Sequence, residues 1–418
     1  MTAFADQCRY VGLIGAASVG VAFAKLMGLL AMVLIACSVV SAQATSLAAT
    51  RAGLAAHSCS AWPRWEAFKD KFISADGRVI DVGSDDARTV SEGQAYGLFF
   101  ALVANDRSQF EKLLDMTQNI LAQGDLTTHL PAWLWGQRSD GTWGVIDSSP
   151  ASDADLWMAY TLLQAGHVWH ERRFIALGTL LARQILSQET ARLPALGWSL
   201  LPGPKGFHPS ADVWRLNPSY VPLQVLRGLN TALPEQAKWR ELIGTSRRLL
   251  VETAPNGFSP DWAQYQSASG KSGFLPDKAT SAMGSYNAIR VYLWVGMLDR
   301  ADPDAALLLK TFRPMVDYVQ KHGFPPETIN TVTGKPGPNA GNAGFSAALV
   351  PFLQTSGEPL LAQAQAVRIE QLETQAPLGY YSQVLSLFGL GWQADRFRFQ
   401  ANGDLWLAWQ QGCPAESR

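Results

Sequence analysis

One segment of the chain, residues 151–169, reads ASDADLWMAYTLLQAGHVW. Its apolar residues recur at helical spacing, which predicts a helix over residues 155–169. Two carboxylates, Asp153 and Asp155, stand at the start of this helix, and we expect Ser152 or Asp153 to cap it. Capping alone would account for Asp155, because acidic side chains stabilise a first helical turn by about 0.3–1 kcal/mol.

Helical spacing of apolar residues recurs along the rest of the chain. The pattern predicts further helices over residues 62–72, 92–104, 110–121, 173–186, 223–230, 238–253, 288–298, 304–319, 343–354 and 380–391. Strand signals are few and short, such as the one at residues 141–146. A succession of helices without alternating strands predicts an all-α fold, and pairing of helices through long loops favours an α/α toroid. An α-solenoid, the alternative, would show a repeat of fixed period, which we do not find.

Two other predicted helices begin with polar groups. Residues 89–97 read TVSEGQAYG, with Ser91 as the expected N-cap, and residues 284–290 read GSYNAIR. In a barrel of alternating helices the inner helices run parallel, so the N-terminal ends of these helices share one mouth. Polar groups collected there can converge on one ligand.

Glu92 differs from an ordinary capping residue. Gly93 and Gly97 follow it, and both are weak helix formers whose spacing keeps one face of the helix bare. Capping does not require a bare face, whereas close approach of a substrate or of another backbone does. We therefore interpret Glu92 as a functional carboxylate.

Many of the 15 tryptophans lie in loops rich in Gly and Pro. Flat aromatic faces can stack on the apolar faces of sugar rings, while sugar hydroxyls bond to neighbouring Asp, Asn and Arg. We expect Trp133, Trp135 and Trp262 to line such a groove. Trp157 and Trp294 instead lie within predicted helices, where a core position is the ordinary expectation.

Several motifs together resemble glycoside hydrolase family 8, and within it the periplasmic endoglucanases of bacterial cellulose-synthesis operons. They are SEGQAYG at 91–97, ASDAD at 151–155 with its helix, SYNAIRVYLW at 285–294, LPAWLWG at 130–136, NPSY at 217–220, ETAPNGFSPDW at 252–262 and GFSAA at 344–348. The resemblance runs from about Cys59 to Cys413. It implies an (α/α)6 barrel, that is, a six-hairpin toroid, and endo-acting hydrolysis of a β-1,4-glucan chain with inversion and without a cofactor or metal.

The resemblance also implies roles for individual residues. Glu92 would be the general acid that protonates the leaving oxygen, and Asp153 would hold and distort the sugar at the cleavage point. An inverting enzyme places its acid about 6.5–9.5 Å from a carboxylate base. Because a helix N-terminus favours the charged form, burial or a neighbour such as Asp153 must raise the pKa of Glu92. The expected substrate-binding residues are Trp133, Trp135, Asp155, Tyr220, Asp261, Trp262 and Arg290.

Asn287 departs from the family pattern. It stands where the cellulose-operon enzymes carry the Asp that serves as general base, and an amide is a very weak base. Three interpretations stay open. Asp153 or Asp261 activates the water instead, the protein is a weak hydrolase or a glucan-binding relative, or the sequence is an inactivated variant or contains an error.

The N-terminal segment of the chain predicts export. Residues 1–44 combine a basic n-region, the apolar run LMGLLAMVLIACSVV at 26–40 and the small-residue site Ala42-Gln43-Ala44, which is typical of an export signal. A retained anchor over 11–40 and a lipoprotein box at 34–37 are the alternatives. We expect a linker at 45–58, one catalytic domain at 59–413, a tail at 414–418, and a periplasmic or secreted protein that meets the membrane only through its signal.

Cys59 and Cys413 are the only cysteines outside the export segment. Exported proteins meet an oxidising compartment and domain termini often lie close together, so a disulfide between them is expected; two unpaired thiols are the alternative. The net charge of −1, without a basic stripe, argues against nucleic acid as a partner. The absence of CxxC motifs and His clusters argues against a metal site.

Competing functions remain at this point. A catalytically impaired relative could bind and guide the nascent glucan, with the cellulose synthase export machinery as partner. A lyase or epimerase of α/α-barrel type would need basic residues facing a uronate, whereas the predicted site is acidic and aromatic. Xylan and chitosan are the other polysaccharides that similar sites cut.

Overall fold

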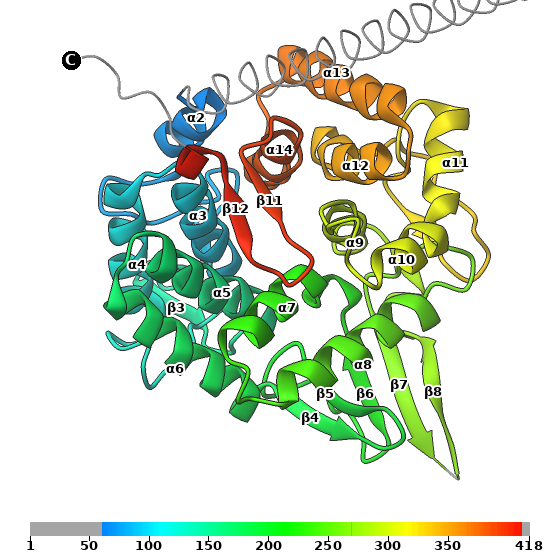
Figure 1. The fold of residues 1–418 in the computed structure, drawn as a ribbon, viewed down its shortest axis with the longest axis horizontal. Helices are drawn as coiled ribbons and strands as arrows, with labels where there is room; N and C mark the ends of the chain where they lie inside the picture. Colours follow the sequence, from blue (N-terminus) through cyan, green and yellow to red (C-terminus); the bar gives the residue numbers. More distant parts are fainter. Residues whose placement is uncertain (1–60, 269, 412–418) are drawn as a thin grey trace, which may run out of the picture. The chain divides into compact units, whose positions relative to one another are not determined.

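Helices form the framework of the computed structural model, which describes residues 61–268 and 270–411 (Figure 1). Within these residues six helices form an inner ring: α3 (Ser91–Val103), α5 (Ser152–Val168), α7 (Leu223–Ala232), α9 (Ala288–Gly296), α12 (Ala343–Thr355) and α14 (Tyr380–Gln393). The others surround it: α2 (Pro63–Phe72), α4 (Arg107–Leu121), α6 (Arg172–Gln188), α8 (Lys238–Glu252), α10 (Ala305–Thr311), α11 (Arg313–His322) and α13 (Pro359–Gln375). The structure therefore has the predicted (α/α)6 barrel.

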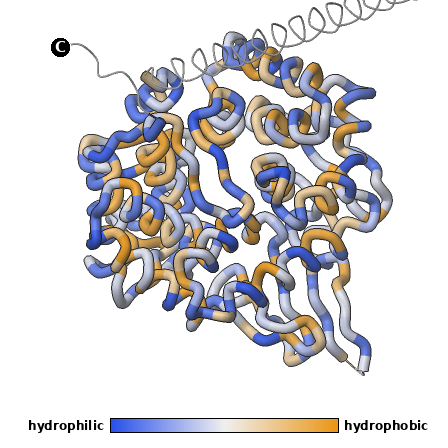
Figure 2. Tube along the Cα trace, viewed as in Figure 1, coloured by the Kyte–Doolittle hydropathy of each residue, from blue (hydrophilic) through white to orange (hydrophobic). Residues whose placement is uncertain are grey.

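Burial separates the two rings. The inner helices α3, α5 and α12 are buried along almost their whole length, whereas α4, α6 and α8 bury one stripe and expose the rest. A helix that is apolar all round must lie inside a fold, and an amphipathic helix covers it. In Figure 2 hydrophobic and hydrophilic residues accordingly alternate along the outer helices.

The barrel axis is filled by aromatic side chains. Phe388 of α14 contacts rings of three other inner helices, with centroid distances of 4.6 Å to Phe100, 5.2 Å to Trp157 and 5.3 Å to Trp294. Trp157 and Trp294 are 0% and 3% exposed, which confirms their predicted core positions. These contacts close the ring by joining its last helix to its first.

Short strands decorate the loops between the helices. They are β1 (Thr89–Val90), β2 (Leu134–Gln137), β3 (Trp143–Asp147), β4 (Thr190–Leu193), β5 (Gly197–Leu200), β6 (Val213–Leu216), β7 (Ala263–Ala268), β8 (Lys271–Pro276), β9 (Met283–Gly284), β10 (Ile329–Asn330), β11 (Phe397–Phe399) and β12 (Leu405–Leu407). All pairings are antiparallel, in the orders β1-β2-β3, β4-β5, β6-β7-β8, β9-β10 and β11-β12. Strands are thus more numerous than the sequence suggested, and each belongs to a small hairpin or ribbon. The β11-β12 hairpin packs against the inner ring, because Phe397 and Phe399 of β11 contact the ring of Phe99 of α3.

One helix prediction was wrong, and one helix was missed. The helix expected over 304–319 is divided at Phe312 into α10 and α11, because Pro314 lies in the first turn of α11 and cannot donate a backbone hydrogen bond within a continuous helix. Helix α13 was not predicted. Its apolar residues do not define one face, since Leu360 is 85% exposed and Val367 is 41% exposed.

Several predictions concern parts of the chain that the structure does not describe. The export signal, the linker, the tail and the Cys59–Cys413 disulfide lie outside the described residues. Among the residues that are described, no helix is both long and apolar enough to cross a membrane.

Candidate functional site

The N-terminal ends of the inner helices surround a cavity of about 520 Å³. It is lined by residues at or near the start of α3, α9, α12 and α14, together with Asp81 from the loop before β1; these residues are Glu92, Tyr286, Asn287, Arg290, Asn342, Gly379, Tyr380, Tyr381 and Ser382. The expected shared mouth is therefore present. Asp81, Asn342, Tyr380 and Tyr381 were not predicted from the sequence as site residues. The start of an apolar helix, the signal that drew attention to Glu92, also marks Tyr380 and Tyr381.

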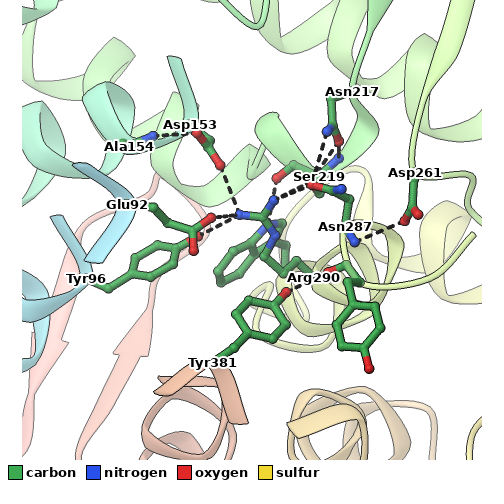
Figure 3. A network of polar contacts seen from close by, with 12 residues as sticks. Glu92, Tyr96, Asp153, Ala154, Asn217, Ser219, Asp261, Asn287, Arg290 and Tyr381 are labelled. Atoms are coloured by element: carbon green, nitrogen blue, oxygen red, sulfur yellow. Dashed lines mark hydrogen bonds and ion pairs between the residues drawn. The ribbon is translucent and has the colours of Figure 1, made fainter. Parts of the chain in front are cut away.

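Arg290 joins the three predicted catalytic positions (Figure 3). Its buried guanidinium donates through Nη1 to Glu92 and, at 2.9 Å, to Oδ2 of Asp153. Through Nη2 it donates to Oδ1 of Asn287 at 2.8 Å and to Oγ of Ser219 at 3.1 Å. One cation in the first turn of α9 thus holds together side chains from α3, α5 and the start of α9.

Burial makes Glu92 suitable for proton transfer near neutral pH. Its side chain is 20% exposed. Desolvation raises the pKa of Glu92 to about 7; Arg290 opposes this increase and Asp153 adds to it. Burial therefore overcomes the preference of a helix N-terminus for the charged form. A carboxyl group with this pKa can hold a proton in neutral solution and release it during a reaction.

The hydrogen bonds of Asn287 determine how its amide is oriented. The oxygen Oδ1 accepts from Nη2 of Arg290 at 2.8 Å and from Nδ2 of Asn217 at 3.3 Å. A guanidinium can only donate, so the amide oxygen must be the atom that faces Arg290. The –NH2 group of Asn287 is then left for the cavity that the residue lines. A donor therefore stands where a base would have to accept a proton.

Asp261 supports the segment that carries Asn287. Its Oδ1 accepts from the backbone N–H groups of Ser285, Asn287 and Ala288 at 2.9, 3.0 and 2.7 Å, and so caps the start of α9 from a separate loop. Burial raises the pKa of Asp261, while these three backbone hydrogen bonds lower it. Asp261 was expected to bind substrate or to replace the base, but one of its oxygens is already occupied by the backbone.

Asp261→Ala is expected to destabilise the protein by about 1–3 kcal/mol, because three backbone donors at the start of α9 lose their acceptor. Asp261→Asn is the matched control, since its amide oxygen can accept the same three hydrogen bonds and should retain most of the stability. Urea unfolding at pH 7 measures both variants. Equal midpoints for Asp261→Ala and the parent would show that the cap contributes nothing.

The predicted caps of the first two helices were wrong. Neither Ser91 nor Ser152 nor Asp153 makes a side-chain capping bond. Instead, the backbone N–H of Ser91 donates to the carbonyl of Trp133, and that of Ser152 donates to the carbonyl of Pro202, each at 3.0 Å. Loop carbonyls therefore hold these helix starts. Asp153 remains available to Arg290, and Oδ1 of Asp153 accepts from the N–H of the next residue at 2.9 Å.

The bare face of α3 does not approach a substrate. A Cβ added to Gly93 would lie 2.5 Å from the hydroxyl oxygen of Tyr380, and one added to Gly97 would lie 3.3 Å from atoms of Leu113 and Val79. The glycines are thus needed for the packing of α3 against side chains of neighbouring elements. The expectation of a substrate or another backbone at this face is corrected accordingly.

Asp155 lies away from the cavity. Its side chain is fully buried and has no surface with which to touch a sugar. It faces Glu189, which follows the last residue of α6 and is also fully buried. Glu189 could not be recognised from the sequence, because a glutamate at the end of an amphipathic outer helix gives no sign of burial.

Two aromatic pairs lie in the loop regions, one on strands β2 and β3 and one in the loops before β6 and β7. Trp135 of β2 stacks on Trp143 of β3 with ring centroids 5.3 Å apart, and the guanidinium of Arg78 lies 4.9 Å from the Trp135 ring. Trp262 stacks on Phe207 at 5.8 Å with nearly parallel rings. Trp143 is 49% exposed and was not named from the sequence.

The other predicted aromatic residues are placed between these pairs and the charged network. The Tyr220 ring lies 6.0 Å from that of Trp262 and 5.6 Å from the Arg290 guanidinium. Trp133 is partly buried and hydrogen-bonds through its side chain to Asp147.

Within residues 61–268 and 270–411, no group of His, Cys, Asp or Glu side chains could hold a metal ion.

An all-α barrel with buried carboxylates at one mouth and exposed aromatic rings beside them is the architecture of a helical glycoside hydrolase. The chain belongs to the glycosyl hydrolases family 8, whose family model matches residues 39–395.

Relatives and solved structures agree with this assignment. The chain is 48% identical over 360 residues to an endoglucanase from Salmonella typhi, which covers 86% of this chain and 94% of the relative. It is 46% identical over 362 residues to an endoglucanase from Xanthomonas axonopodis, and the match covers 86% of this chain and 92% of the relative. The crystal structure of an endo-1,4-D-glucanase from Vibrio fischeri superposes with a TM-score of 0.77 at 45% identity, covering 84% of this chain and 99% of that one.

Proposed function

We propose that the protein is an endoglucanase that hydrolyses β-1,4-glucan chains with inversion of configuration. The observation that carries this proposal is the network in which Arg290 joins Glu92 and Asn287, which line one cavity, to the buried Asp153 behind them. The endoglucanases similar to this chain support the choice of substrate. The exposed rings of Trp143 and of Tyr286, which lines the cavity, offer aromatic surfaces of the kind on which sugar rings stack.

Each residue then has a chemical task. Glu92 donates its proton to the leaving glycosidic oxygen as the bond from that oxygen to the anomeric carbon breaks. A water molecule attacks the anomeric carbon from the opposite face, between the sugar and residue 287, and in the absence of a base there its proton passes to solvent water. Asp153, held by Arg290, binds the sugar at the cleavage point. Removal of the proton from the attacking water is the slow step, because the –NH2 group of Asn287 cannot accept that proton.

The two carboxylates considered as replacement bases are both engaged. Asp153 accepts from Arg290 on one oxygen and from a backbone N–H on the other. Oδ1 of Asp261 accepts three backbone N–H groups. These contacts favour slow hydrolysis without an efficient base. They also support the second candidate function, a glucan-binding relative that guides the polymer during cellulose synthesis alongside the export machinery.

We place this activity in the periplasm or outside the cell, because residues 1–44 have the composition of an export signal. An association with cellulose synthesis belongs to the same proposal.

Release of reducing sugar from carboxymethylcellulose tests the function. The purified protein should release it slowly, with a rapid fall in viscosity that indicates internal cuts, and Glu92→Gln should release none. Asn287→Asp is assayed in parallel, and xylan and chitosan serve as substrate controls. If neither the parent nor Asn287→Asp acts on the cellulose derivative but both bind cello-oligosaccharides, the glucan-binding alternative is correct. Faster action on xylan or chitosan would reassign the substrate.

A further inference from the structure

Two buried carboxyl groups lie next to each other behind the site. Asp155 belongs to the first turn of α5, and Glu189 follows the last residue of α6. Because α5 and α6 form an antiparallel hairpin, the start of one helix meets the end of the other. Both residues are 0% exposed, and their side chains are in hydrogen-bonding contact.

None of the four carboxyl oxygens of this pair has a hydrogen-bond donor among the described residues. The charged groups nearby are directed elsewhere. Asp153, on the same turn of α5, accepts from Arg290 of α9. The Nζ group of Lys238 of α8 donates to the Leu186 carbonyl and to Oγ1 of Thr190.

Two carboxylates without cations or donors are not stable in a dry interior. Ionised groups there need compensating partners, and two carboxyl groups in contact cannot both be charged. A proton placed between them supplies the missing donor. The pair must therefore hold one proton, which one oxygen donates to the other residue.

The helix ends indicate which residue holds the proton. A helix N-terminus stabilises a negative charge and a C-terminus destabilises it. Asp155 stands at the N-terminus of α5 and Glu189 at the C-terminus of α6. Burial raises the pKa of both groups; their mutual hydrogen bond then lowers the pKa of Asp155 and raises that of Glu189. Asp155 is the acceptor and Glu189 the donor.

We propose that Glu189 is a positioning residue which keeps its proton at neutral pH, donates it to Asp155, and so holds the turn of α5 that presents Asp153 to Arg290. Three observations support this inference: the pair is buried, the described residues offer it no other donor, and Asp155 follows Asp153 by two residues in the same helical turn. Its consequence for sugar binding rests on the proposed function of the site, whereas its consequence for folding does not.

The folding consequence has a definite sign. Glu189 has a folded-state pKa above its ordinary value of 4.5, so folding takes up a proton once the unfolded chain is ionised. The stability that this proton provides is complete below about pH 4.5 and is lost as pH rises toward the folded-state pKa. Glu189→Gln keeps a neutral donor to Asp155 but has no proton to lose.

The experiment compares the unfolding equilibria of Glu189→Gln and the parent by urea denaturation between pH 4.5 and 8. As pH rises above 4.5, the parent should lose stability relative to Glu189→Gln. The ratio of their unfolding equilibrium constants should change by up to about tenfold per pH unit, because one proton is linked to folding. Glu252→Gln, which removes an exposed carboxyl from the end of α8, is the matched control and should show no such trend. A ratio for Glu189→Gln that does not change with pH would overturn the proposal.

A second measurement tests the positioning of Asp153. Cello-oligosaccharide dissociation constants are measured in the Glu92→Gln background, where Glu92 cannot titrate. Binding should weaken once pH rises far enough above neutrality for the pair to lose its proton, and adding Glu189→Gln should remove that dependence. Persistence of the dependence would contradict the positioning role. If the stability trend appears but no oligosaccharide binds at any pH, the proposed glucan function fails while the protonated pair stands.

Discussion

Replacing Asn287 with aspartate is expected to raise the turnover number on a cello-oligosaccharide by about 10²–10⁴-fold, the usual contribution of a correctly placed base. Aspartate is nearly isosteric with asparagine. One of its oxygens can keep the hydrogen bonds that Arg290 and Asn217 now donate to Oδ1. The other oxygen then replaces the –NH2 group at the cavity and can take the proton of the attacking water.

The affinity for the oligosaccharide should change little, because the base acts on water more than on the bound sugar. Asn342→Asp is the matched control. It adds the same charge to the same cavity from the start of α12, and its carboxylate can still cap that helix as Oδ1 of Asn342 does. This control should not accelerate the reaction. An Asn287→Asp variant that is no faster than the parent would show that the missing carboxylate at position 287 does not limit the rate. Asp153 or Asp261 would then be the candidate base.

Glu92→Gln is expected to lower the turnover number by about 10²–10⁴-fold or more, in the parent and in Asn287→Asp alike, because glutamine has no carboxyl proton to donate to the leaving oxygen. Its amide oxygen can still accept from Arg290, so the network and the binding of cello-oligosaccharides should be retained. Single-turnover kinetics and calorimetric binding on one oligosaccharide measure both quantities.

The pH dependence gives an independent check of the same residue. The active form of Glu92 is protonated and burial raises its pKa to about 7, so the hydrolysis rate of Asn287→Asp should fall as pH rises through about 7. Glu327→Gln is the control: it removes an exposed carboxyl that accepts from Tyr286 at 2.9 Å near the mouth, and should leave the rate unchanged. Wild-type turnover in Glu92→Gln would mean that the acid is another group.

Much of the fold and part of the site could be predicted from local sequence. Helices α3, α5 and α12 are buried on nearly all sides, and the polar residues Glu92, Asp153 and Asn287 stand at the starts of inner helices. Parallel inner helices bring such starts together in any barrel of this type. The errors have local causes as well: Pro314 divides one predicted helix, and the exposed Leu360 obscures the apolar pattern of another.

Features that depend on distant parts of the chain could not be predicted. The helix starts are capped by loop carbonyls and by Asp261, since any acceptor that folding brings within reach can replace a residue's own cap. Gly97 faces side chains of other elements because packing fills the bare face of α3. Asp155 carries the same carboxyl group as Asp153 two residues earlier, yet it points into the core toward Glu189.

The sequence by itself determined the succession of apolar helices, the polar groups at their starts and the identity of the group at position 287, because each depends only on residue types and their spacing. The tertiary structure alone decided the charge states and orientations. Burial, which sums over the whole fold, raises the pKa of Glu92. The guanidinium of Arg290, which can only donate, turns the amide oxygen of Asn287 toward itself and the –NH2 group toward the cavity.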